Sequence, residues 1–567
     1  MFAISLSILL WFGVLLGMGL SLERFLLGSL PINSKRLGPG TISILGLSGL
    51  AVWSLLINFF IPLSQFVTWT TLGLGWGGLL IQRKRLRTLF SNTEIAIGIT
   101  SVFAVSLIAV LSYFNIDTGY YHLPLVTLSQ KFPVLPGIAN VFGPYGLTPT
   151  WFLIEAIINI PLLGLASTFS LNALLAVCFI LFLSEWCVSE SLWLWSFIGV
   201  CLLCLNHLML GVGGLSPDFP VGILGVMVWC VLLNASIGDG TGNRNCNRNR
   251  NGSALIFSAL AISIKISAIS MVFPIAGTII FAISSDSLSE PRQSFLLKVI
   301  NRCGGGRVLF FSVLLVALTC FRSVISSGCA LFPQKNSCLQ RLPWTVPPQI
   351  VEDWLSDVKY HLCGVRMTGG VFSNGECFKN WTTHIRGESL LKALGFCVLM
   401  ILGGSVILAV KKKRPDFKKV LNVRFYCLVA ILLLSGVTWL LSAPVLRYGF
   451  WIGVAVAGLL AGMVGEIFSL KLKNRLPLLY TGLLIAFVLS IRSAILTHPL
   501  SIDLIHWPRI SNFESVVYKG EGNIDIRNPV GDFRCWNMTA PCTPDRTVFT
   551  IHNSEMSRPW FSPGDKK

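Results

Sequence analysis

The sequence predicts an all-α protein that crosses a membrane many times, and two observations lead to this prediction. Hydrophobic residues make up 53% of the 567 residues and charged residues only 12%, with a mean hydropathy of +0.72. A soluble globular protein carries about 25% charged residues. Apolar runs of about 17–25 residues recur along the chain, and a helix of that length crosses a bilayer.

The apolar runs predict about fourteen transmembrane helices, with ends fixed to within a few residues. The predicted spans are 2–20, 40–61, 65–81, 95–113, 168–184, 191–210, 218–236, 253–265, 267–285, 308–321, 391–410, 425–441, 449–468 and 477–494. The first span lacks the basic start and the small-residue cleavage site of a secretory signal, so we expect it to be retained. The segment 253–285 fits either one long helix or two short ones.

Basic linkers between the apolar runs set the predicted orientation. Lys and Arg gather in the segments 83–87, 243–251, 292–307, 411–424 and 471–475. The positive-inside rule places such linkers in the cytoplasm. They also account for the formal net charge of +19. Because no basic stripe with interleaved aromatic residues accompanies that charge, we expect no nucleic-acid partner.

This orientation divides the chain into five parts. We expect N-terminal transmembrane helices in 1–90, a membrane core with an outer loop (114–167) in 91–321, an extracytoplasmic loop in 322–390, C-terminal transmembrane helices in 391–494 and an extracytoplasmic tail in 495–567. Within the first outer loop, the apolar segment 151–163 is too short for a comfortable span. We expect it to form a helix on the outer surface. The tail fits a small irregular or β-rich appendage.

The cysteines agree with this placement. Of 16 cysteines, six lie in the two segments expected outside, namely Cys329, Cys338, Cys363, Cys377, Cys535 and Cys542. An even number in an oxidising compartment indicates disulfides. Cys535 and Cys542 are the best pair because they are close in a polar tail, whereas pairing among the other four stays open. No Cys or His spacing indicates a zinc site.

The first candidate site follows the span 95–113. It contains Asp117, Tyr120, Tyr121 and His122 in the stretch DTGYYHLP. An acid at the end of a membrane helix costs free energy unless it has a partner or a function. Asp117 fits a general base or a ligand of a divalent metal, and His122 fits a ligand of a phosphate or sugar oxygen. Alternatively, Asp117 caps a helix starting near Thr118, and the aromatic residues form an interfacial belt.

Two further polar residues stand at the ends of apolar runs. Asp218 begins the span 218–236, where it either caps that helix or faces Asp117 across one cavity. Lys265 has apolar and hydroxyl neighbours and lies outside the basic linkers. A lone lysine in such a run pairs with an acid or faces a cavity, where an anionic lipid phosphate is a natural partner. The alternative for Lys265 is snorkelling to the outer interface.

Two arginines complete the candidates. Arg322 follows the span 308–321, and Arg447 is the only basic residue of the short outer loop between the spans 425–441 and 449–468. A guanidinium binds phosphate with two parallel hydrogen bonds, so each arginine fits a substrate phosphate or a lipid headgroup. No P-loop, Rossmann glycine pattern or nucleophile elbow occurs in a suitable context.

In this order, the acids and the lysine resemble the GT-C superfamily of membrane glycosyltransferases, including its mannosyltransferase and aminoarabinose-transferase branches. The resemblance covers roughly 95–330. Asp117 matches the acid of the first outer loop, Asp218 the acid before the fourth core helix, and Lys265 a lysine of some branches. The motifs at 117–124, 136–140, 327–333 and 535–544 also look like an uncharacterised bacterial family of multi-pass proteins.

The GT-C resemblance implies a polyprenyl-phosphate sugar as donor and a saccharide, lipid or protein of the cell envelope as acceptor. Asp117 would deprotonate the acceptor hydroxyl, which attacks with inversion, and Asp218 would share the catalytic site. Lys265, Arg322 or Arg447 would stabilise the departing polyprenyl phosphate. Many GT-C members carry two adjacent acids, but Thr118 follows Asp117 here, so a divalent metal is an open expectation. The expected location is the bacterial inner membrane, with the site facing the periplasm.

Two other functions stay open from the sequence. A transporter or flippase for a lipid-linked saccharide would favour inverted repeats and interrupted helices near the midplane. No clear repeat is visible, and the candidate residues gather at one face, which favours an enzyme. A surface-polysaccharide polymerase or ligase would have a large outer loop with arginines, which 322–390 resembles. A noncatalytic assembly protein is the least specific alternative.

Overall fold

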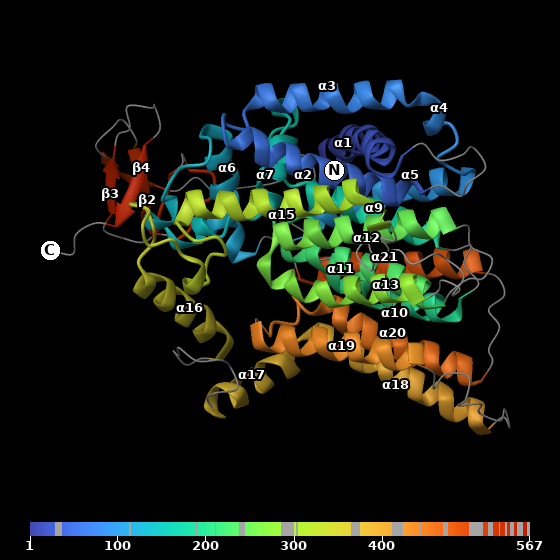
Figure 1. Ribbon diagram of the computed structural model, residues 1–567. Helices are drawn as coiled ribbons and strands as arrows, with labels where there is room; N and C mark the ends of the chain where they lie inside the picture. Colours follow the sequence, from blue (N-terminus) through green and yellow to red (C-terminus); the bar gives the residue numbers. More distant parts are fainter. Residues whose placement is uncertain are drawn as a thin grey trace.

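The computed structural model shows a helical protein with few strands (Figure 1). It describes residues 1–28, 37–112, 115–186, 191–209, 211–237, 244–284, 300–301, 304–363, 375–410, 423–442, 444–468, 475–497, 514–519, 525–531, 533–538, 541–544, 549–552 and 559–563. Ten helices of these described parts are long and apolar enough to cross a membrane. The prediction of a multi-pass helical membrane protein is confirmed at this level.

The helices follow one another with short connections. They are α1 (Phe2–Leu22), α2 (Pro39–Asn58), α3 (Gln65–Ile81), α4 (Arg83–Leu86), α5 (Asn92–Leu111), α6 (Leu123–Lys131), α7 (Thr150–Ile158), α8 (Leu165–Thr168), α9 (Leu171–Glu185), α10 (Leu192–Met209), α11 (Asp218–Ile237), α12 (Arg244–Ile264), α13 (Val272–Ser284), α15 (Gly306–Ser327), α16 (Pro348–Cys363), α17 (Gly375–Gly387), α18 (Ser389–Val410), α19 (Val423–Ser442), α20 (Phe450–Ile467) and α21 (Arg475–Thr497). Shorter helical turns are η1 (Glu23–Leu27), η2 (Thr118–His122), η3 (Ile138–Asn140), η4 (Gly143–Gly146), η5 (Pro161–Leu163), η6 (Ile266–Met271) and η7 (Lys335–Ser337).

The ten long apolar helices coincide with ten of the fourteen predicted spans. The other four predictions fall on α3, α10, α12 and α13, which are helical in the described residues. α3 has 17 residues, and the apolar parts of α10 and of η6 with α13 are also short. α12 begins in the polar segment RNCNRNRN, so its apolar part is shorter than the helix. The structure therefore supports ten spans by length and composition.

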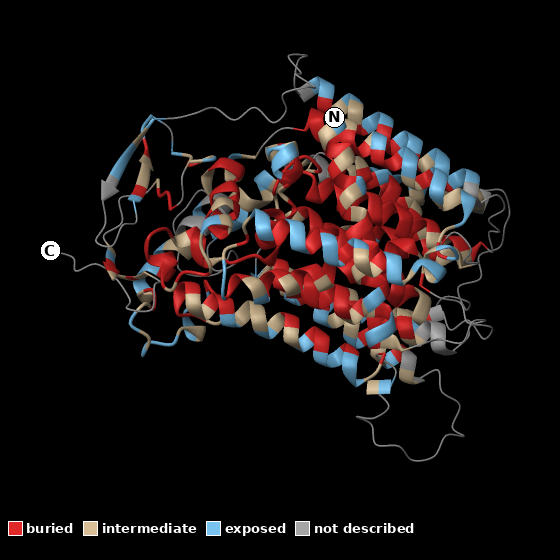
Figure 2. Ribbon diagram, turned by 90° about the horizontal axis from the view of Figure 1, so that it is seen from above, coloured by how far each residue is buried: buried red, intermediate tan, exposed pale blue. Residues whose placement is uncertain are grey.

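α9 and α11 are almost entirely buried, whereas α18 and α19 are mostly exposed and lie at one edge of the bundle in Figure 1. Figure 2 shows buried residues filling the middle of the bundle. Small residues permit this close packing. A Cβ on Gly40 of α2 would lie 2.2 Å from the backbone nitrogen of Phe182 of α9, and one on Gly46 would lie 1.9 Å from the carbonyl oxygen of Leu15. The exposed apolar side chains of the outer helices face the surroundings that a bilayer would fill.

α5 leads into the first candidate segment, and its start is fixed by a capping box. The Ser91 hydroxyl accepts a hydrogen bond from the Glu94 backbone N–H (3.2 Å), and the Glu94 carboxylate accepts one from the Ser91 N–H (2.8 Å). This reciprocal pair satisfies donors that the first helical turn leaves free. The helix runs to Leu111, two residues before the predicted end of its span.

The helix predicted at 151–163 is present in a shorter form, and protein covers it on all sides. A helix is present as α7, but all nine of its residues are buried. Its sequence, TWFLIEAII, has no continuous polar face, and such a helix packs inside the protein. Buried hydrogen bonds anchor α7, since Thr68 donates to the carbonyl of Ile157 (2.8 Å) and Trp11 donates to that of Ile158 (3.1 Å).

The tail contains two small antiparallel sheets, β1 (Ser515–Lys519) with β2 (Asp525–Pro529) and β3 (Phe549–His552) with β4 (Trp560–Pro563). Figure 1 shows these strands, α16 and α17 at one end of the bundle and α4 at the other. The tail lies directly on the first outer loop. The Trp536 N–H donates to the carbonyl of Gly119 (2.8 Å), and the Phe561 N–H donates to that of Pro136 (3.0 Å).

Disulfides occur at this same end of the molecule. Cys535 and Cys542 form a disulfide in the tail, and Cys329 and Cys338 form another after α15. Cys377 is also disulfide-bonded, whereas the side chain of Cys363 lies outside the described residues. The short Cys535–Cys542 loop includes Trp536, so the bond holds the residue that contacts Gly119.

Candidate functional site

The centre of the candidate site is an ion cluster around Asp218, the first residue of α11. One carboxylate oxygen of Asp218 accepts from the Lys265 ammonium at 2.5 Å, and the other lies 2.9 Å from Nε of Arg447. The Asp218 side chain is 13% exposed, compared with 23% for Lys265 and 51% for Arg447. Three segments distant in the sequence therefore meet at one carboxylate.

Lys265 reaches Asp218 because the helix breaks at this lysine. α12 ends at Ile264, Lys265 has an extended backbone (φ −153°, ψ 124°), and η6 follows. The segment 253–285 thus forms two helical parts, which was one of the two alternatives. The Lys265 ammonium lies 3.4 Å from the ring centroid of Tyr448, and the Arg447 guanidinium lies 5.4 Å from it. Such cation–π contacts hold cations over an aromatic face.

Asn172 of α9 holds the loop that delivers Asp218. Its buried side-chain amide donates to the carbonyls of Gly211 (3.2 Å), Gly214 (2.8 Å) and Ser216 (3.3 Å). Its carbonyl oxygen accepts from the Trp151 indole N–H at 3.1 Å. Buried polar groups need such partners, so one side chain ties α7, α9 and the loop before α11 together.

Tyr121 and His122 face the same cluster from the π-helical turn η2. Burial, followed by the influence of the nearby Asp117, Tyr448 and Asp218, raises the pKa of Tyr121 well above its usual value. Burial lowers the pKa of His122 to about 3. The charges of Lys265 and Arg447 also lower this pKa, and the negative charge of Asp218 opposes them. The imidazole is therefore neutral at pH 7, with one proton to donate and one nitrogen to accept.

Asp117 interacts electrostatically with the site through Arg447. Burial opposes the charge of Arg447, but Asp218 and, less strongly, Asp117 raise its pKa above the usual value. Both predicted acids thus act on one guanidinium. The Asp117 carboxylate accepts from the Asn115 amide at 3.4 Å and makes no capping hydrogen bond to η2. The alternative in which Asp117 serves as a side-chain cap of that turn is not supported.

The carboxylates of Asp117 and Asp218 differ in their interaction partners. Each oxygen of Asp218 faces a cation, so this carboxylate is engaged in positioning Lys265 and Arg447. Asp117 is half-buried, as Asp218 is, and its charge acts on Arg447. With two acids and two cations, the four charged side chains balance. Among the described residues, no three His, Cys, Asp or Glu side chains gather into a group that could hold a metal ion.

Two predicted site residues lie elsewhere. Tyr120 points its ring toward Phe142 (5.0 Å) and toward Phe533 of the tail (6.0 Å) rather than toward the ion cluster. Arg322 lies in α15 beside Asn58 and lines a separate pocket. The structure therefore brings together Asp117, Tyr121, His122, Asp218, Lys265 and Arg447 and leaves Tyr120 and Arg322 outside.

Sequence reasoning missed three residues of this site. Tyr448 follows Arg447 directly, and an aromatic residue beside a lone arginine was the available signal. Asn172 gives no signal, because a single amide inside an apolar span does not identify its partners. Trp536 lies in the tail motif, but only the tertiary structure shows that its ring packs on Gly119, where a Cβ would come within 2.6 Å.

One protein family matches most of the chain. A family model described as a domain of unknown function, DUF8201, matches residues 1–454. The matched part includes the four charged residues of the cluster, and the strands of the tail lie beyond it. A search of curated proteins found no match. Since the match covers most of the chain, the protein belongs to the DUF8201 family.

Proposed function

We propose that this protein is a GT-C-like membrane glycosyltransferase. It would transfer a sugar from a polyprenyl-phosphate-linked donor to an envelope acceptor, with inversion. The observation that carries this proposal is that Asp218 contacts both Lys265 and Arg447, while Asp117 also acts on Arg447. A base beside fixed cations is the arrangement that sugar transfer from a phosphate needs.

In the proposed reaction, Asp117 takes the proton of the acceptor hydroxyl. The hydroxyl oxygen attacks the anomeric carbon, and the bond from that carbon to the phosphate oxygen breaks. The phosphate leaves with the bonding electron pair, next to Lys265 and Arg447. Their positive charge stabilises the charge that develops on the leaving oxygen. Asp218 acts as a positioning residue because it holds both cations at fixed places before the donor arrives.

The polarity of the molecule supports an extracytoplasmic site in a bacterial inner membrane. The basic helix α4 lies at one end of the bundle and the tail at the other (Figure 1). Basic segments are retained in the cytoplasm. Disulfides form in oxidising compartments, and those at Cys329–Cys338 and Cys535–Cys542 lie at the end of the cluster. About fourteen crossings and a GT-C core are part of this proposal.

The experiment is transfer of a labelled sugar from polyprenyl-phosphate donors by the purified protein in proteoliposomes. We expect Asp117→Asn to slow transfer roughly 100-fold or more, as loss of a general base does, while donor binding persists. Asp353→Asn changes an exposed acid of α16 and serves as the matched control. Equal transfer by wild type and Asp117→Asn would remove the base from the proposal.

One observation favours the alternative of a lipid-linked saccharide flippase. The helix break at Lys265 resembles the interrupted helices with which transporters bind substrates. The same proteoliposomes separate the two functions. A flippase moves the labelled lipid between leaflets without forming a new glycoside, and a glycosyltransferase forms the glycoside when donor and acceptor face the same leaflet.

A further inference from the structure

Arg322 is a buried cation outside the ion cluster. It lies in α15, five residues before the helix ends at Ser327, which is about 7–8 Å along the axis. Only 5% of the residue is exposed. Charged side chains inside a membrane protein ordinarily pair with an opposite charge or serve a function. The groups around Arg322 therefore indicate whether this charge is paired within the protein or serves to bind a ligand.

Protein groups satisfy little of the hydrogen-bonding capacity of the Arg322 guanidinium. Its Nη2 lies 3.5 Å from Oδ1 of Asn58, at the limit of a hydrogen bond, and its Nε has no partner. No described carboxylate forms an ion pair with Arg322. The Asn58 amide is held in turn, because it donates to the Phe132 carbonyl at 3.2 Å. A buried charge without an opposite charge beside it costs several kcal/mol, so an anion bound at this place would stabilise the protein.

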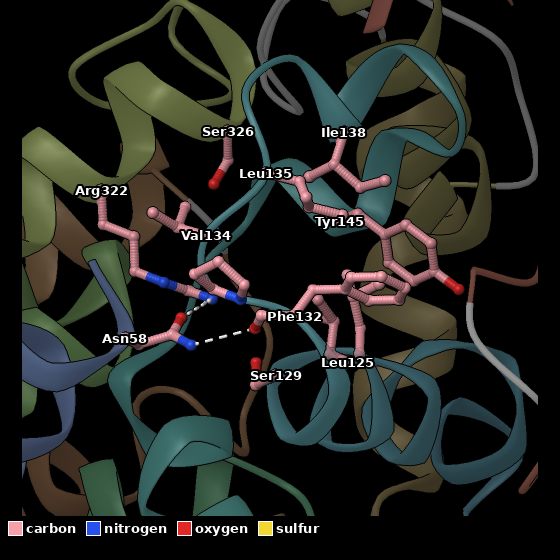
Figure 3. A pocket seen from close by; sticks show the side chains of 12 residues that line it. Asn58, Leu125, Ser129, Phe132, Val134, Leu135, Ile138, Tyr145, Arg322 and Ser326 are labelled. Carbon is pink, nitrogen blue, oxygen red and sulfur yellow. Dashed lines mark hydrogen bonds between the residues drawn. The ribbon is translucent and has the colours of Figure 1, made fainter. Parts of the chain in front are cut away.

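A small pocket lies beside this side chain (Figure 3). Arg322, Asn58 and Ser326 line one side of it, and Leu125, Phe132 and Ile138 line the other. The hydroxyls of Ser129 and Ser326 also line the pocket and form no hydrogen bond with a described residue. No acid lines it. Unused donors on one side and hydrocarbon on the other fit an amphipathic anion.

The edge of this region carries exposed aromatic rings. Phe321, next to Arg322, is 56% exposed, and Phe60, next to the end of α2, is 72% exposed. The rings of Phe59 and Phe321 contact each other with centroids 5.3 Å apart, which joins the ends of α2 and α15. Exposed aromatic rings at helix ends are typical of the interface between headgroups and acyl chains.

We propose that the Arg322 pocket binds the anionic phosphate of a membrane lipid, at a site separate from the Asp218 cluster. The phosphate accepts from the Arg322 guanidinium and from the Ser326 and Ser129 hydroxyls, and charge-assisted bonds of this kind are strong. The lipid chains extend past Phe321. None of the cluster's charged residues lines the pocket, and α6 separates the two, with His122 before its start and Ser129 near its end.

This site does not depend on the proposed glycosyl transfer. It assigns Arg322 to lipid recognition. The phosphate that it binds could come from two sources, a phospholipid of the surrounding membrane or a phosphate free in solution. The hydrocarbon side of the pocket and the exposed ring of Phe321 favour the lipid. A free phosphate would gain nothing from those apolar surfaces.

The test uses the full protein, delipidated in detergent, with native mass spectrometry and thermal unfolding as readouts. The probes are phosphatidylglycerol, diacylglycerol and inorganic phosphate. We expect phosphatidylglycerol to bind and to raise the unfolding temperature, and the other two probes to do neither. Arg322→Gln should weaken phosphatidylglycerol binding at least tenfold. Arg307→Gln, at the other end of α15, is the matched control and should bind as wild type does.

Three outcomes would overturn the proposal. Equal phosphatidylglycerol binding by wild type and Arg322→Gln would show that the guanidinium does not hold the phosphate. Binding of inorganic phosphate with the same Arg322 dependence would assign the pocket to a free anion. Should Arg322→Gln fail to fold, the Ser129→Ala, Ser326→Ala double variant takes its place, and affinity reduced less than threefold would count against the site.

Discussion

Replacing Asp218 by Asn removes the one charge that holds Lys265 and Arg447 together. The change keeps the size of the side chain, so packing is preserved while both contacts, at 2.5 and 2.9 Å, lose their anion. Removing one partner of a fully buried pair costs about 3–5 kcal/mol. Arg447 is half exposed and Lys265 is 23% exposed, so solvent screens part of the loss. We therefore expect roughly 2–3 kcal/mol of destabilisation.

The assay is the free energy of unfolding in mixed micelles, measured for Asp218→Asn, Lys265→Gln and the double variant. Because the partners are in contact, the single effects should not add. An exposed pair supplies the matched control, since Lys335 and Glu352 are also 2.5 Å apart but 53% and 43% exposed. Glu352→Gln should cost at most about 1 kcal/mol. Equal costs at both sites would refute the reasoning from burial.

Three further predictions concern the supports of the site. Burial lowers the folded-state pKa of His122 from 6.5 to about 3, so the unfolded chain binds a proton that the folded protein does not; stability is complete above pH 6.5 and falls as the pH drops toward 3. His122→Gln should remove this part of the acid sensitivity, which unfolding measurements between pH 7 and 4 would detect, and an unchanged pH profile would contradict the assignment. Asn172→Ala removes three donated hydrogen bonds and one accepted bond; leaving buried carbonyls unpaired should cost roughly 2–4 kcal/mol, measured by thermal unfolding, and a loss under 1 kcal/mol would show that water replaces the amide. Gly119→Ala places a Cβ 2.6 Å from the Trp536 ring and should expose the tail to limited proteolysis, whereas Gly73→Ala, with nothing within 4 Å, should leave the digestion pattern of wild type; identical digestion of both variants would mean that the ring shifts freely.

Sequence patterns predicted the membrane class and ten of the long spans because apolar run length is a local property. They also identified four charged residues that the structure brings together, since an acid or a lone cation at the end of an apolar run is costly wherever the chain goes. The placement of α7 could not be predicted from its length. A nine-residue helix is too short to span, but the sequence does not state which neighbours cover it.

Tertiary contacts account for the other differences. Arg322 and Arg447 look alike in the sequence, because each is a lone arginine after an apolar run. Only the packing of α15 on α2 places Arg322 beside Asn58, and only the turn between α19 and α20 places Arg447 beside Asp218. The break at Lys265 was one of two alternatives, and the extended backbone there decides it. Partner choice over long sequence distances is the information that spacing lacks.

The charge balance of the cluster has a consequence for any phosphate that enters it. Asp117 and Asp218 offset Lys265 and Arg447, so a donor phosphate adds negative charge to a site that is neutral without it. The phosphate must therefore share the two cations with Asp218, whose oxygens already occupy them at 2.5 and 2.9 Å. As the phosphate draws these cations toward itself, the hold of Asp218 weakens, and the repulsion at Asp117 favours its protonated form. In the proposed glycosyl transfer, the base would thus gain affinity for the acceptor proton when the donor is bound, which would couple the arrival of the donor to the start of the reaction.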